Sequence, residues 1–149
     1  MKIVDIKSRV ITGLCVRTKN SDEMVESSAK IGKLWREFNG VVANKMKAGA
    51  FTYGVYYQYE SDFTGEFNVL AGADLIEEAA QADLMSVSIT AGKYIVFTGK
   101  GEMPKAVIDT WSDIWNYFSA TDCAHKRAYT TDFELYKGFN EVEIHIAIK

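Results

Sequence analysis

The sequence predicts an α+β fold made of two similar halves, each with the order strand–helix–strand–strand. In each half, apolar residues recur at helical spacing and are followed by two segments rich in aromatic and β-branched residues, which are typical of strands. The two helical stripes also correspond, because Trp35 in the first and Trp115 in the second lie roughly 80 residues apart. We therefore expect a tandem repeat whose two modules pair their strands.

The length of the chain favours a single domain. It has 149 residues, the usual size of one domain, and its only proline is Pro104. No linker of distinct composition divides it, so we expect one domain over residues 1–149. The halves span about 1–75 and 85–149, and the weakly helical residues 74–85 connect them.

The first half begins with a strand and a helix. Residues 9–17 are apolar and β-branched and predict a strand with a break at Gly13. Ser21 is placed to cap the helix that follows, and Gly40 lies where such a helix often stops. The buried stripe of this helix comprises Ile31, Leu34, Trp35 and Phe38.

The second half repeats this order. Residues 93–98 predict a strand, residues 99–101 a loop, and Pro104 suits the first turn of a helix, where no backbone N–H is needed. The apolar stripe of that helix comprises Val107, Ile108, Trp111, Ile114, Trp115 and Phe118.

Each half ends in a predicted hairpin. Residues 51–59 and 67–73 form the first, and residues 129–136 and 142–148 form the second. Apolar residues alternate strictly in the last of these strands, so one of its faces is buried. His145 lies on the other parity, and we expect it to be exposed to solvent.

Composition excludes several classes of protein. The net charge is −3 and the pI about 5.4, which argues against a nucleic-acid partner. Cys15 and Cys123 lie far apart, without zinc-ligand spacing, and predict neither a metal site nor a disulfide framework. No apolar signal region and no run long enough to span a membrane is present, so we expect a cytoplasmic protein.

No catalytic motif stands out. The sequence lacks a phosphate-binding glycine loop and a nucleophile elbow, and the glycine-flanked turn at residues 99–101 is too short to bind a dinucleotide. His125 and His145 share no ligand spacing with cysteines or acids. We expect no cofactor and no metal.

Aromatic residues around one acid are the remaining candidates. The first hairpin carries Tyr53, Tyr56, Tyr57 and Tyr59, and in the second hairpin Glu134 and Tyr136 share a face. Rings around a carboxylate suit an organic cation, with about 0.5–2 kcal/mol of cation–π attraction per ring. By spacing alone, a packed aromatic core and an exposed glutamate are the commoner outcome.

Three segments, with the order of elements around them, resemble the GyrI-like, AraC-type bacterial effector-binding domain. The resemblance covers nearly the whole chain and is greatest to the stand-alone integron gene-cassette and YdeE-like members. Thr90 departs from the pattern, which has a proline there. The segments are Tyr53-Gly-Val-Tyr56, Ala91-Gly-Lys-Tyr94 with Phe97, and Asp132-Phe-Glu134-Leu-Tyr136.

The resemblance implies two strand–helix–strand–strand modules forming a curved antiparallel sheet with a central pocket. Relatives are ligand sensors of Rob- and BmrR-type multidrug regulators, in which a glutamate at the position of Glu134 faces the pocket. The positions that the resemblance and the shared strand face assign to ligand binding are Glu134, Trp35, Tyr56 or Tyr57, Trp111 or Trp115, and Tyr136.

The resemblance implies a binding module for a small hydrophobic, often cationic, molecule rather than an enzyme. No helix-turn-helix region is recognisable, so no direct binding of nucleic acid is expected. One alternative is a hydrolase of reactive xenobiotics with Glu134 as general base. Another is an interaction protein like the gyrase inhibitor that names the family. Free edge strands could also pair in a homodimer.

Overall fold

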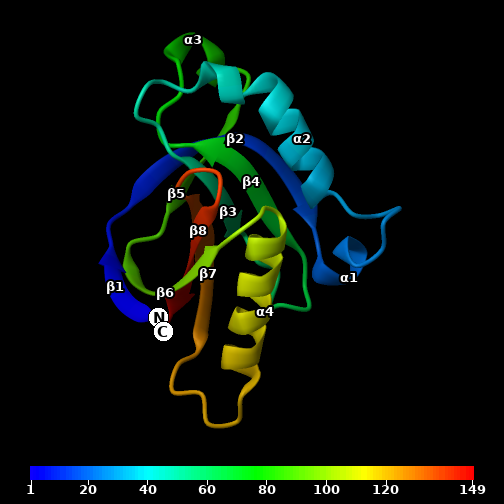
Figure 1. Cartoon of the computed structure of the whole chain (residues 1–149), viewed down its shortest axis with the longest axis vertical. Helices are drawn as coiled ribbons and strands as arrows, with labels where there is room; N and C mark the ends of the chain where they lie inside the picture. Colours follow the sequence, from blue (N-terminus) through cyan, green and yellow to red (C-terminus); the bar gives the residue numbers. More distant parts are fainter.

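The computed structural model describes residues 1–149 and confirms the α+β class (Figure 1). Eight strands form one antiparallel sheet in the order β1-β6-β8-β7-β3-β4-β2-β5. The strands are β1 (Lys2–Ile6), β2 (Arg9–Thr18), β3 (Thr52–Tyr57), β4 (Phe67–Ala73), β5 (Met85–Ile89), β6 (Gly92–Lys100), β7 (Arg127–Tyr136) and β8 (Glu141–Ile148). The helices are α1 (Asn20–Glu23), α2 (Ile31–Val41), α3 (Glu78–Gln81) and α4 (Lys105–Ser119), with a 3-10 turn at Ala43–Lys45.

The predicted repeat is visible in the order of the strands. The first module is β2-α2-β3-β4 and the second is β6-α4-β7-β8, and they meet where β3 pairs with β7. Two strands were not predicted. β1 precedes the first module but pairs with β6 of the second, and β5 precedes the second module but pairs with β2 of the first.

These two edge strands require a strongly curved sheet. Only Lys7 and Ser8 join β1 to β2, although five strands lie between them in the sheet. Thr90 and Ala91 join β5 to β6 across the same number of strands. Such short connections are possible only because the sheet curls until its edges approach each other.

The first helical region differs from its prediction. A single helix capped by Ser21 is wrong, because the chain forms the short α1 and then a separate α2. The Glu23 carboxylate accepts hydrogen bonds from the backbone N–H groups of Lys30 and Ile31 and so satisfies the start of α2. The predicted break at Gly13 is also absent, because β2 runs through it.

Helices α2 and α4 pack on one face of the sheet, each over its own module (Figure 1). Leu34 and Phe38 of α2 pack against Val69 and Phe67 of β4. In the second module Ile114 of α4 packs among apolar residues of β6 and β8. The candidate site lies between these two helices.

The opposite face of the sheet buries a third core, which the curled edges cover. Its members include Tyr53, Tyr57, Tyr94 and Phe133. The expectation that His145 is exposed is wrong, because this second face is also buried. His145 is 5% exposed and stacks on Phe133 with ring centroids 4.3 Å apart. Burial lowers the pKa of His145 to about 4.

No helix combines the length and the apolar character required to cross a bilayer. Both cysteines, Cys15 and Cys123, are free thiols. No three histidine, cysteine, aspartate or glutamate side chains gather closely enough to hold a metal ion.

Candidate functional site

Glu134 lies at the centre of the helix-covered face. It projects from β7, directly opposite Gly54 of β3, and its side chain is 2% exposed. Its Oε2 accepts hydrogen bonds from the Tyr56 hydroxyl at 2.9 Å and from Trp111 Nε1 at 2.8 Å. Its Oε1 accepts one from the Tyr136 hydroxyl at 2.9 Å.

The three donors to Glu134 are all uncharged, and no lysine, arginine or histidine forms an ion pair with it. Burial raises the pKa of Glu134, and the hydrogen bonds from Trp111, Tyr136 and Tyr56 oppose that rise. Burial and the nearby carboxylate raise the pKa values of Tyr56 and Tyr136 well above normal, so both phenols stay protonated and donate. The site thus holds a buried acid without a counter-charge.

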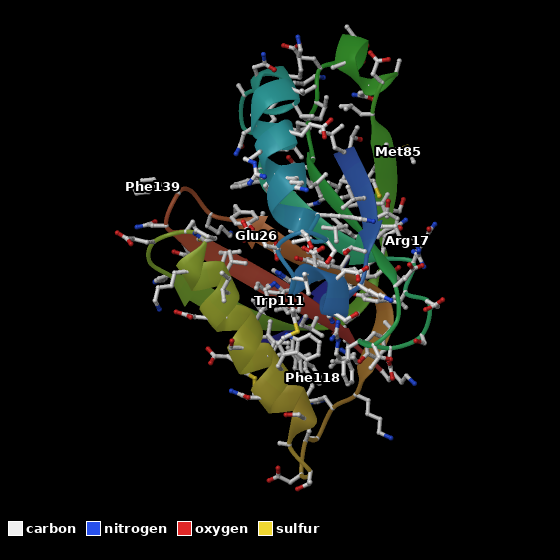
Figure 2. The ribbon with its side chains drawn as sticks, turned by 90° about the vertical axis from the view of Figure 1, so that its right-hand side faces the viewer. Arg17, Glu26, Met85, Trp111, Phe118 and Phe139 are labelled. Carbon is white, nitrogen blue, oxygen red and sulfur yellow. The ribbon has the colours of Figure 1, made fainter.

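Aromatic rings surround this carboxylate. Tyr56 and Trp111 meet edge to face with centroids 5.2 Å apart, and Trp35 meets Tyr136 in the same way at 5.4 Å. These four rings come from β3, α4, α2 and β7, so both modules contribute to the enclosure. Figure 2 shows Trp111 on the side of α4 that faces the rest of the molecule.

A second buried acid, Asp132, lies two residues before Glu134 on the same face. It is fully buried and, unlike Glu134, has a cation: Arg127 Nη2 lies 2.7 Å from its Oδ2. The backbone N–H of Ala147 and the Tyr59 hydroxyl also donate to it. Burial lowers the pKa of Arg127, but Asp132, Tyr59 and Tyr129 together raise it by more, so the net shift of the pKa is upward.

The guanidinium of Arg127 itself occupies an aromatic cage. Its Cζ lies 4.5 Å from the ring centroid of Tyr129 and 5.9 Å from those of Tyr59 and Trp115. Its Nε has no hydrogen-bond partner. The protein therefore already contains one organic cation held by rings and a carboxylate, next to a similar acid that lacks one.

A cavity of about 180 Å³ opens between the helices beside these two acids. Tyr56 and Trp111 form part of its wall, whereas Glu134 does not border it, so these two rings separate the cavity from the carboxylate. The lining residues are Asn20, Glu23, Ile31, Tyr56, Tyr59, Phe63, Phe67, Trp111, Trp115 and Arg127.

The structure brings six of the seven candidate residues together around this region: Glu134, Trp35, Tyr56, Trp111, Trp115 and Tyr136. Tyr57 is the exception. Because side chains alternate along β3, Tyr57 lies in the opposite core, where its hydroxyl is 3.3 Å from Cys15 Sγ. Its assignment to the pocket was therefore wrong.

Neither Asp132 nor Arg127 was predicted as a site residue, and Tyr59 was named only as one of four tyrosines of the first hairpin. Asp132 could have been predicted, because side chains alternate along a strand and residues 132 and 134 therefore share a face. The ion pair of Arg127 with Asp132 could not be predicted, because the ladder between β7 and β8 shifts register between residues 127 and 132. That irregularity brings Arg127 back onto Asp132.

Comparison with known proteins agrees with this architecture. Residues 2–148 match the family described as integron-associated effector-binding protein, Cass2. The integron cassette protein VCH_CASS2 of Vibrio cholerae is 47% identical, with a TM-score of 0.94 over 99% of this chain and 95% of that one.

Two more distant matches also cover nearly the whole chain. YobU of Bacillus subtilis (strain 168), named as a transcriptional regulator, is 26% identical over 99% of this chain and 96% of its own. The structure of SAV2435 bound to tetraphenylphosphonium shares the fold, with a TM-score of 0.76 and 22% identity over 99% of this chain and 93% of that one. This chain belongs to the family of integron-associated effector-binding proteins.

Proposed function

We propose that this protein binds a hydrophobic organic monocation and that Glu134 neutralises its charge. The observation that carries the proposal is the contrast between the two buried acids. Asp132 has Arg127 as its counter-ion, whereas Glu134 has only neutral donors. A buried ion without a partner is costly, and a bound cation would remove that cost.

The surrounding rings define the rest of the ligand. Trp35, Tyr56, Trp111 and Tyr136 offer apolar surface and the negative faces of their rings, which suit a cation whose charge is spread over a hydrophobic body. A small, strongly hydrated cation would gain less from these contacts. Tetraphenylphosphonium, which occupies SAV2435, belongs to the expected chemical class and serves as a probe.

Binding requires the site to widen. The cavity of about 180 Å³ is smaller than the roughly 300–1,000 Å³ of typical ligand pockets. Tyr56 and Trp111 both donate to Oε2 of Glu134 and both line the cavity. A ligand that displaces either ring would therefore enlarge the cavity and expose the carboxylate in one movement.

Calorimetric titration with tetraphenylphosphonium and with neutral triphenylphosphine oxide tests this function. Glu134→Gln should weaken binding of the cation about tenfold or more and change binding of the neutral compound little, because it removes the charge and keeps the size of the side chain. Glu78→Gln is the matched control, since it removes the same charge from an exposed position on α3. Equal weakening of both compounds by Glu134→Gln would contradict the proposal.

Hydrolysis with Glu134 as general base is the second candidate, and its buried carboxyl with a raised pKa favours it. Oε2 already accepts two hydrogen bonds and Oε1 one, so a water could reach the carboxyl only at the remaining acceptor position of Oε1, and Glu134 does not border the cavity between the helices. We therefore place binding first. Release of product from activated esters, absent in Glu134→Gln, would reverse that order.

A further inference from the structure

A second cavity lies on the face of the sheet opposite Glu134. Its volume is about 400 Å³, which falls within the usual range for small-molecule sites of roughly 300–1,000 Å³. It shares no lining residue with the cavity between the helices. The residues that line it are Asp5, Ile6, Lys7, Ser8, Arg9, Tyr53, Ile89, Phe133, Leu135 and His145.

Aromatic rings line the buried side of this cavity. Phe133 and His145 stack with an interplanar angle of 11°, and the ring centroids of Tyr53 and Phe133 lie 5.9 Å apart. His145 is 5% exposed, and burial lowers its pKa to about 4, so near pH 7 its imidazole is a neutral ring in the cavity wall.

The other side of the cavity is basic. It is formed by the connection between β1 and β2, which carries Lys7, Ser8 and Arg9. Arg9 Nη1 donates to the Tyr53 hydroxyl, which brings its guanidinium over the aromatic part. The one acid in the lining, Asp5, already pairs with Lys93 at 3.1 Å. The charged side chains of the rim thus favour an anion.

We infer that this cavity is a second ligand site, which takes a small aromatic carboxylate. The ring would lie against Phe133 and His145, and the carboxylate would meet the donors of Arg9 and Lys7. The inference does not depend on cation binding at Glu134, because consecutive residues of β7 point to opposite faces. Phe133 belongs to one site and Glu134 to the other.

Calorimetric titration with 2-naphthoate and its uncharged amide, 2-naphthamide, tests the inference. The wild type should bind naphthoate and prefer it to the amide. Arg9→Met should lower the affinity for naphthoate about tenfold or more, because a charged hydrogen bond is lost. Arg36→Met, an exposed arginine on α2, is the matched control and should leave binding unchanged, as should Glu134→Gln.

A second readout reports on the wall of the cavity itself. Naphthoate should shift the imidazole ¹⁵N resonances of His145 in NMR spectra, while those of His125 stay in place. The inference is overturned if naphthoate does not bind the wild type, or if Arg9→Met and Arg36→Met weaken it equally. It is also overturned if the His145 resonances do not move at saturation.

Discussion

Gly54 and Glu134 face each other across the pairing of β3 with β7, and the glycine makes room for the acid. A Cβ at position 54 would lie 2.6 Å from Oε1 of Glu134 and 3.1 Å from Cζ2 of Trp35. The carboxylate is buried between two modules because one of them has no side chain at this point.

Replacement of this glycine should therefore disturb the site directly. Gly54→Ala should lower the free energy of unfolding by about 1–3 kcal/mol, because an extra methyl group overpacks a filled space. It should also weaken the binding of tetraphenylphosphonium, because the added methyl group displaces Glu134. Gly40→Ala is the control, since a Cβ there meets nothing within 4 Å in the exposed part of α2. Chemical denaturation and calorimetry measure both effects, and equal behaviour of the two variants would contradict this account.

Cation affinity should depend on pH through Glu134. Burial raises its pKa, and a cation binds the ionised form, so affinity should fall as the pH decreases through this raised value. The loss approaches tenfold per pH unit once the acid is mostly protonated. Titrations with tetraphenylphosphonium, whose charge does not change with pH, measure it. In Glu134→Gln this dependence of affinity on pH should vanish. An unchanged dependence in that variant would assign the titration to another group.

The ion pair between Arg127 and Asp132 should be important for stability. Arg127→Met leaves a fully buried aspartate without its cation, which costs about 3–5 kcal/mol. Asp132→Asn in the same background removes the unpaired charge and should restore part of the loss. Thermal and urea denaturation of the two single variants and the double variant provide the comparison. Additive losses in the double variant would show that the two residues do not act as a pair.

Stability should also fall in weak acid because of His145. Its pKa is about 4 in the folded protein and 6.5 when unperturbed, so the unfolded chain takes up a proton that the folded protein excludes. The free energy of unfolding should therefore decrease as the pH falls from about 6.5 towards 4, by up to about 3 kcal/mol. His145→Gln should flatten this part of the profile, while His125→Gln should not. Denaturation curves between pH 4 and 7 decide the matter.

Helices α2 and α4 and the two hairpins were predictable because each has its own local periodicity. The stripe of α2 and the alternation of β8 are examples in which one buried face is visible in the sequence. Strands β1 and β5 have no such signal. They are five residues long, and Ile89 is their only fully buried residue, so their partners in the other half determine that they are strands.

The candidate site was predictable in its residue types but not in its directions. Tyr56 and Tyr57 are adjacent and of the same type, and only the pairing of β3 with β7 shows that Tyr56 faces the helices and Tyr57 the opposite core. The prediction that His145 is exposed was wrong for a related reason. Alternation identifies two faces, but it does not reveal that a curled sheet can bury both.

The exchange of edge strands ties the two halves into a single folding unit. A fragment that ends before β5 would keep β1 but lack β6, and the complementary fragment would keep β5 but lack β2. Neither piece could complete its own sheet, whereas a mixture of the two could. By the same topology, a half-length chain could complete this sheet only as a reciprocal pair, in which each copy lends its first strand to the other.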